Sequence, residues 1–295
     1  MIHKNKKSTF IITETRVKLS GLLRMLAVLF GILTAPIQAQ ESSDVHPYLT
    51  NKYTVDMGVF FPDRTLKIRV NGTIPGANRN VDFENRLRVK EDDETFALNL
   101  GWRYRENWSL FTQYFESGVS SGAVLAEDVK WKDTVFVAGS NVRAGQDFAL
   151  FRVFFGRAFD TSERHEFGVG AGFHWLEIRA FIEGNVILGG GGTTFRREAV
   201  SASGPLPNIG VWYKYSLSPR WAFRSRLDWL AASVGDYDGK IINASFGVNY
   251  QTSDHFGIGL DYNLIELDVD VSKSDWQGRA AISYDGLYAS MSFYW

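Results

Sequence analysis

Alternation of apolar and polar residues runs through most of the chain after residue 53. The segment GIGLDYNL (257–264) shows it clearly, because four apolar residues alternate with four glycine or polar ones: Ile258, Leu260, Tyr262 and Leu264 against Gly257, Gly259, Asp261 and Asn263. Successive side chains of a β-strand point to opposite faces, so this period indicates strands with one apolar and one polar face. Helical periodicity is nearly absent, and the sequence predicts an all-β fold.

The alternating segments are long. Ten candidate strands can be counted, with eight to twelve as the range: 53–70, 94–105, 108–119, 146–157, 165–178, 206–217, 220–232, 240–251, 255–267 and 279–295. Most exceed the 5 to 6 residues that are usual for strands of soluble proteins, whereas a tilted membrane-spanning strand needs about 9–11. Segment length therefore favours strands that cross a bilayer.

The connections between these strands fall into two groups. Short connections alternate with mostly long ones along the chain. The short ones are 105–108, 158–165, 216–221 and 252–256; the others are 71–93, 120–145, 179–205, 268–278 and the briefer 233–240. Short turns at one end and long loops at the other are typical of a membrane-spanning antiparallel up-and-down β-barrel of the bacterial outer membrane. An even strand number puts both chain termini at the short-turn, periplasmic end of the barrel.

The segment LYASMSFYW (287–295) supports this interpretation. Its apolar residues stand at alternate positions and lead to the aromatic Trp295. It resembles the C-terminal signal of outer-membrane barrel proteins, although phenylalanine is the commoner last residue in that class. The resemblance implies that the barrel-assembly machinery reads this strand and that the strand pairs with the first one.

The N-terminal 39 residues differ from the rest of the chain. Six Lys and Arg residues precede the apolar run MLAVLFGILT (25–34), and the sequence APIQAQ follows. This pattern predicts a cleavable signal peptide over 1–39, a periplasmic segment over 40–52 and a barrel over 53–295. Residues 1–39 hold six of the 32 Lys and Arg and one of the 33 Asp and Glu, which leaves 26 against 32, a net charge of −6. That balance argues against nucleic-acid binding, and the absence of cysteine excludes disulfides and thiolate chemistry.

Parity along the strands predicts the direction of individual side chains. Residues expected in the lumen are Arg103, Arg152, His174, Trp212, Lys214, Arg224, Arg226, Asp228, Asp261, Tyr288 and Tyr294, with opposite charges paired. A periplasmic girdle of aromatic residues is expected from Tyr104, Trp108, Tyr215, Trp221, Tyr250, Phe256 and Trp295. Leu260 is expected to face lipid, and Gly259 to face a crowded lumen where serine should be tolerated and a larger residue could clash.

Three further features bear on chemistry. His174 is expected near the external rim, where Glu177, Asp236 or Asp238 could orient it as a base. LGGGGTT (188–194) lacks the phosphate-loop pattern and is interpreted as an external loop. The carboxylates of 91–94 and 268–270 could meet divalent ions that bridge lipopolysaccharide, but they do not match a calcium loop. No catalytic, cofactor or metal residue is assigned.

The sequence thus favours a small, non-enzymatic barrel in the cell outer membrane, with structural or ligand-contacting external loops. Two alternatives stay open: a narrow channel or conduit for small or hydrophobic molecules, and a barrel enzyme of the lipid A hydrolase or protease type. The expected partners are outer-membrane lipids, lipopolysaccharide and the assembly machinery. The sequence does not define an oligomeric state.

Overall fold

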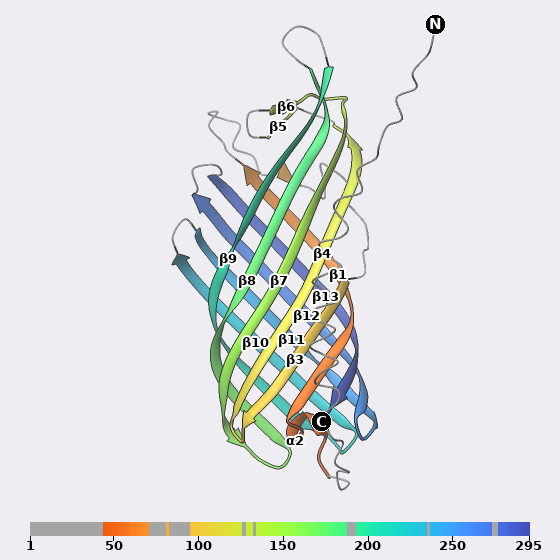
Figure 1. Cartoon of the computed structure of the whole chain (residues 1–295), viewed down its shortest axis with the longest axis vertical. Coiled ribbons are helices and arrows are strands. Elements are labelled where there is room, and N and C mark those ends of the chain that lie inside the picture. The colour runs from red at the N-terminus through yellow and green to blue at the C-terminus, as the bar shows by residue number, and fades with distance from the viewer. Residues whose placement is uncertain are drawn as a thin grey trace, which may run out of the picture. The chain divides into compact units, whose positions relative to one another are not determined.

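The computed structural model describes residues 44–70, 81–82, 95–125, 128–131, 134–187, 193–234, 237–272 and 277–295. Ten long strands form a wall: β1 (Tyr53–Val70), β3 (Thr95–Arg105), β4 (Trp108–Val124), β7 (Asn141–Thr161), β8 (His165–Ile187), β9 (Thr193–Ser216), β10 (Trp221–Val234), β11 (Tyr237–Ser253), β12 (Phe256–Ser272) and β13 (Gln277–Tyr294). Each pairs antiparallel with the next, and β13 pairs with β1 (Figure 1). The predicted ten-stranded up-and-down barrel is confirmed.

Four smaller elements accompany the wall. The short helix α2 (Pro47–Thr50) precedes β1, and β2 (Val81–Asp82) pairs with β1. β5 (Val129–Trp131) and β6 (Thr134–Phe136) form a separate hairpin. Within the described ranges, no helix combines the length and apolarity that crossing a membrane requires.

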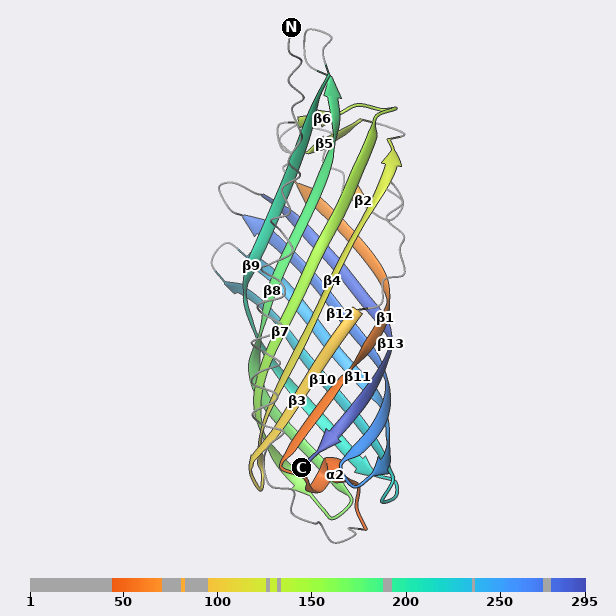
Figure 2. The same ribbon diagram turned by 45° about the vertical axis from the view of Figure 1, so that its right-hand side comes forward.

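The two ends of the barrel differ as the connection lengths predict. Tight turns join β3 to β4, β7 to β8, β9 to β10 and β11 to β12, and we call this the turn end. Both α2 and Trp295 lie at the turn end, as Figure 2 shows, while β5 and β6 lie at the opposite, loop end.

The strands reach further toward the loop end than the sequence predicted. Most of the expected loop 179–205 is strand, because β8 continues to Ile187 and β9 starts at Thr193 in continuous register. Part of the expected loop 120–145 is also strand, since β4 pairs with β7 up to Val124 and the β5–β6 hairpin lies between them in the sequence. The sequence pattern did not predict these strands, because their apolar residues point inward and their polar residues outward, the reverse of a membrane-spanning strand.

The polarity of the two faces inverts partway along several of the longer strands. In β8, the outward residues change from Phe173 and Trp175 to Glu177, while the inward residues change from His174 to Leu176. The same inversion occurs in β12 and β13. In β12 the outward series is Ile258, Leu260, Tyr262, Leu264, Glu266 and Asp268, and the inward series is Gly257, Gly259, Asp261, Asn263, Ile265 and Leu267. The turn half is therefore apolar outside and polar inside, and the loop half is built like a soluble domain.

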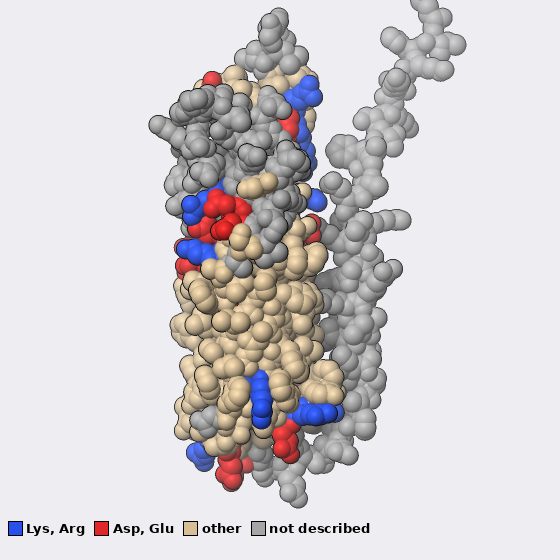
Figure 3. All heavy atoms as spheres, turned by 90° about the vertical axis from the view of Figure 1, so that its left-hand side faces the viewer, with Lys and Arg blue, Asp and Glu red and all other residues tan. Residues whose placement is uncertain are grey.

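The outer surface of the turn half forms an uncharged band. Large apolar side chains there are strongly exposed, among them Phe155, Phe173, Ile209, Leu227, Phe246, Leu260, Leu287 and Met291. On the face in Figure 3, this band separates a zone of charged residues near the loop end from another near the turn end.

The predicted girdle residues stand at the strand ends next to the turns, with Tyr104, Trp108 and Trp221 exposed. Trp175, Trp229 and Tyr262 stand at the other margin of the band. This is the surface that a bilayer requires.

Leu260 and Gly259 take the predicted faces. Leu260 is 50% exposed on the outside. A Cβ atom at Gly259 would lie 2.6 Å from Ser290 Oγ and 2.9 Å from Arg224 Nη2. A Cβ there requires the ends of the Ser290 and Arg224 side chains to shift, which agrees with the predicted crowding, and tolerance of serine stays a prediction.

Two prolines end the pairing between β9 and β10. The β9–β10 ladder stops at Ile209–Trp229, although β9 remains paired with β8 as far as Thr193. Ser216 N donates to Arg164 O on the β8 side, and hydrogen-bonding groups alternate along a strand, so the odd-numbered residues of β9 face β10. Pro205 and Pro207 have no N–H to donate to that neighbour. The seam between β9 and β10 consequently ends at the loop-side margin of the apolar band.

Candidate functional site

The polar lumen of the turn half brings together charged side chains from seven strands. All the residues predicted to point inward do so. The charged side chains that the structure places in this part of the lumen are the cations Arg103, Arg152, Lys214, Arg224 and Arg226 and the anions Asp56, Glu166, Asp228 and Asp261. Each has at least one partner of opposite charge within 4.0 Å. The predicted pairing of lumenal charges is therefore confirmed.

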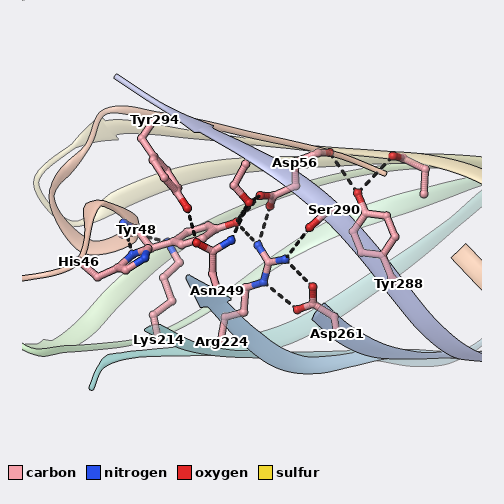
Figure 4. Close-up of polar contacts among 12 residues, drawn as sticks. His46, Tyr48, Asp56, Lys214, Arg224, Asn249, Asp261, Tyr288, Ser290 and Tyr294 are labelled. Atoms are coloured by element: carbon pink, nitrogen blue, oxygen red, sulfur yellow. Dashed lines mark hydrogen bonds and ion pairs between the residues drawn. The ribbon is translucent and has the colours of Figure 1, made fainter. Parts of the chain in front are cut away.

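Arg224 is the centre of a group near the turn end (Figure 4). Its Nε donates to Asp261 Oδ1 at 2.7 Å, and its Nη1 donates to Asp56 Oδ2 at 2.7 Å. Asp56 also accepts from Ser292 Oγ at 2.5 Å. The hydroxyl of Tyr288 donates to the carbonyls of Asp56 and Ala97, so the network is tied to the barrel wall.

The helix α2 closes the turn end of this group. Tyr48 reaches into the lumen, where its hydroxyl contacts Asp56 and Arg224. The carbonyl of Leu49 accepts from Arg103 Nη2 at 3.0 Å. His46 N donates to Ser216 Oγ at 3.0 Å, and the His46 ring stacks on Tyr48 at a centroid distance of 5.6 Å. The segment before β1 thus fills the turn end of the barrel, a role that no periodic pattern in 44–52 signals.

Glu166 anchors a second group beside α2. It accepts from Arg103 Nη1 at 2.5 Å and from the indole N–H of Trp212 at 2.8 Å, and Lys214 Nζ lies 3.3 Å away. Lys214 Nζ also approaches the carbonyl of Tyr48 at 3.5 Å. The group connects β3, β8 and β9 with the helix.

A third layer, which we call the mid-lumen layer, consists of Gln113, Arg152, His174, Arg226, Asp228 and Asn243. The guanidinium of Arg152 meets Asp228 through two contacts of 2.5 and 2.7 Å, and both side chains are fully buried. His174 Nε2 lies 3.1 Å from Asn243 Nδ2 and 4.0 Å from Asp228.

His174 does not have the surroundings expected of a catalytic base. β8 continues to Ile187, so His174 lies inside the barrel and not at its rim. Glu177 and Asp238 point outward, away from His174, and Asp236 lies outside the described residues. His174 is fully buried within the mid-lumen layer. The structure makes it a member of that layer.

Beyond the mid-lumen layer the lumen is a hydrophobic core. Phe60, Phe115, Phe148 and Tyr284 pack ring against ring, and each is at most 2% exposed. Phe136 from the β5–β6 hairpin is buried in the same cluster. Side chains therefore fill the loop half. On the other side of the mid-lumen layer, a cavity of about 110 Å³ separates it from the Arg224 group.

The remaining candidates from the sequence do not form a site in the described residues. Asp268 lies on the outer face and pairs with Arg279 Nε at 2.6 Å. Residues 91–94 and 188–192 lie outside the described ranges. Across the part of the chain that the structure describes, no group of three or more His, Cys, Asp and Glu side chains could hold a metal ion.

Comparison with solved structures gives the class of fold. The outer membrane protease OmpT from Escherichia coli matches with a TM-score of 0.53 at 11% identity, covering 86% of this chain and 100% of that one. The translocator domain of the autotransporter NalP from Neisseria meningitidis matches with a TM-score of 0.39 at 8% identity, covering 95% and 96%. No family model and no curated protein matches the sequence. The fold is that of a bacterial outer-membrane β-barrel.

The burial of His46 predicts that acid loosens α2. Burial first, and then the charge of Arg224, lower the pKa of His46 from 6.5 to about 4, while the Asn249 side chain opposes this shift. The stabilisation from seating neutral His46 is complete above pH 6.5 and is lost as the pH falls toward 4, because the released form binds the proton more tightly. Hydrogen exchange of residues 44–52, corrected for intrinsic rates, should accelerate over this range. His46→Asn should remove the acceleration; an unchanged acid profile in that variant would rule out His46 as the cause.

Proposed function

We propose that this chain is a closed, non-enzymatic barrel of the outer membrane that holds a rigid sheet outside the cell as a contact platform. The observation that carries the proposal is the inversion of polarity along the strands. A conduit needs a continuous bore, whereas here a paired polar network leads directly into a packed apolar core. Such an interior suits a stalk better than a channel.

The loop halves of β4, β7, β8 and β9 form the proposed platform. Their outward face carries charged residues, including Glu183, which lies 3.2 Å from Arg197 and 3.9 Å from Arg143. Thr134 of the β5–β6 hairpin donates to Glu198 at 2.8 Å and ties the hairpin to β9. Phe195 near the tip is 63% exposed. The long-loop end of outer-membrane barrels faces the cell exterior, and we expect lipopolysaccharide to contact the outer face above the apolar band.

A lateral route for hydrophobic molecules is the second candidate function. It is favoured by the β9–β10 seam, where pairing ends at Ile209–Trp229. Leu230 is the next inward residue on β10 and packs against the hydrophobic core, as does Leu206 of β9, which lies one inward position beyond the buried Asn208. An apolar ligand could pass from that core to the bilayer there without crossing the polar lumen.

One reconstitution experiment separates these candidates. The closed barrel should give no single-channel conductance in planar bilayers, because the hydrophobic core closes the loop half and α2 closes the turn end. Vesicles that contain it should take up a hydrophobic fluorophore no faster than empty vesicles. Stable conductance steps would overturn the closed-barrel proposal. Accelerated uptake without conductance would replace it with the lateral route.

A further inference from the structure

The mid-lumen layer carries an excess of positive charge. Nearer the turn end, Arg224 with its two carboxylates has a net charge of −1, and Glu166 with its two cations has a net charge of +1. The charges of these two groups therefore cancel. In the mid-lumen layer, Arg152 and Arg226 share Asp228. The described charges of this layer therefore sum to +1.

The excess charge lies on Arg226. Arg152 occupies both oxygens of Asp228, and Arg226 Nε is 3.5 Å from that carboxylate. The other contacts of Arg226 are to neutral amides, Gln113 Oε1 at 3.0 Å and Asn243 Oδ1 at 3.0 Å. A guanidinium stays protonated in proteins, and Arg226, inside the lumen, has only a shared carboxylate at 3.5 Å as its counter-charge, which is unfavourable. A compensating anion would remove that cost.

The 110 Å³ cavity lies where such an anion would bind. Both Arg152 and Arg226 line it. The buried nitrogens Arg152 Nη1 and Arg226 Nε make no hydrogen bond, and neither does Arg152 Nε, which contacts Asp228 at 2.5 Å. The cavity exceeds the roughly 30 Å³ that one water molecule occupies in the liquid. Asp56 and Asp261 also line it, but both are bound to Arg224, so the Arg152–Arg226 side is the cationic one.

We propose that this cavity is a binding site for one small inorganic anion, a halide or a compact oxoanion, held between Arg152 and Arg226. The anion would accept from the two N–H groups and neutralise the excess charge. Because α2 closes the turn end and the hydrophobic core closes the other side, the anion would be captured as the barrel folds. It would act as a structural ligand of the lumen.

Thermal unfolding in defined salts tests the site. The full chain is folded from urea at constant ionic strength with chloride, with sulfate or with a bulky organic sulfonate as the sole anion. The unfolding midpoint should be several degrees higher in at least one of the two small anions than in the sulfonate. The small anion that raises the midpoint identifies the ligand. Crystals grown with bromide or sulfate should show that anion within hydrogen-bond distance of Arg226.

Two matched variants make the test specific. Arg226→Met removes the excess charge, and its midpoint should no longer depend on the anion. Arg143→Met removes an arginine from the outer face of the loop half and should keep the dependence. Equal midpoints in all salts, the same dependence in both variants, or a cavity that holds water alone would each overturn the proposal.

Discussion

Asp228→Ala is expected to destabilise the folded barrel by about 3–5 kcal/mol, the usual cost of removing one partner of a buried ion pair. Arg152 and Asp228 are both fully buried, and Arg226 depends on the same carboxylate. The substitution therefore leaves two guanidinium groups inside the barrel without a counter-charge. Urea unfolding in lipid vesicles, followed by the gel shift between folded and unfolded forms, measures the change.

Two controls locate the effect in the ion pair. Asp254→Ala, in the exposed turn between β11 and β12, should leave the urea midpoint unchanged. The double variant Arg152→Met/Asp228→Asn removes both charges of the pair and should recover most of the lost stability. If Asp228→Ala unfolds at the same urea concentration as Asp254→Ala, the mid-lumen layer does not stabilise the barrel.

The sequence predicts the turn half of the barrel well, because its strands obey a single rule. Apolar residues such as Leu260 and Trp175 must face lipid, and the residues between them must then face the lumen. A period of two fixes the direction of every side chain once one face is known. Arg152, Asp228 and His174 were therefore placed in the lumen correctly without any knowledge of their partners.

The loop half could not be predicted in the same way. In LEIRAFIE (176–183), the residues Leu176, Ile178 and Ile182 alternate with charged ones, but the apolar set has moved to the other parity. A strand that passes from the bilayer into water must exchange its apolar and polar faces at the boundary. The apolar residues then no longer stand at one continuous set of alternate positions, so the pattern beyond the boundary resembles a loop. The role of α2 was missed for another reason. Tyr48 contacts Asp56 and Arg224 only in the folded barrel, and no periodic pattern in the sequence predicts such a tertiary contact.

The central claim is that the longer strands, such as β8, β12 and β13, have a lipid-facing half and a water-facing half on the same outer surface. β13 offers a matched pair for testing it, because Ala289 and Ala281 both point outward. Ala289 lies beside Leu260 within the apolar band, whereas Ala281 lies beside Asp268 in the loop half. The two substitutions Ala289→Arg and Ala281→Arg are therefore chemically identical and differ in position along the strand.

The free energy of unfolding from vesicles should distinguish the two variants. Ala289→Arg should lose roughly 2–4 kcal/mol, because the guanidinium must enter hydrocarbon near the midplane. Ala281→Arg should stay within about 0.5 kcal/mol of the parent, as surface substitutions usually do. Losses of equal size at both positions would contradict the account, since they would mean that lipid, or water, covers the whole length of the strand.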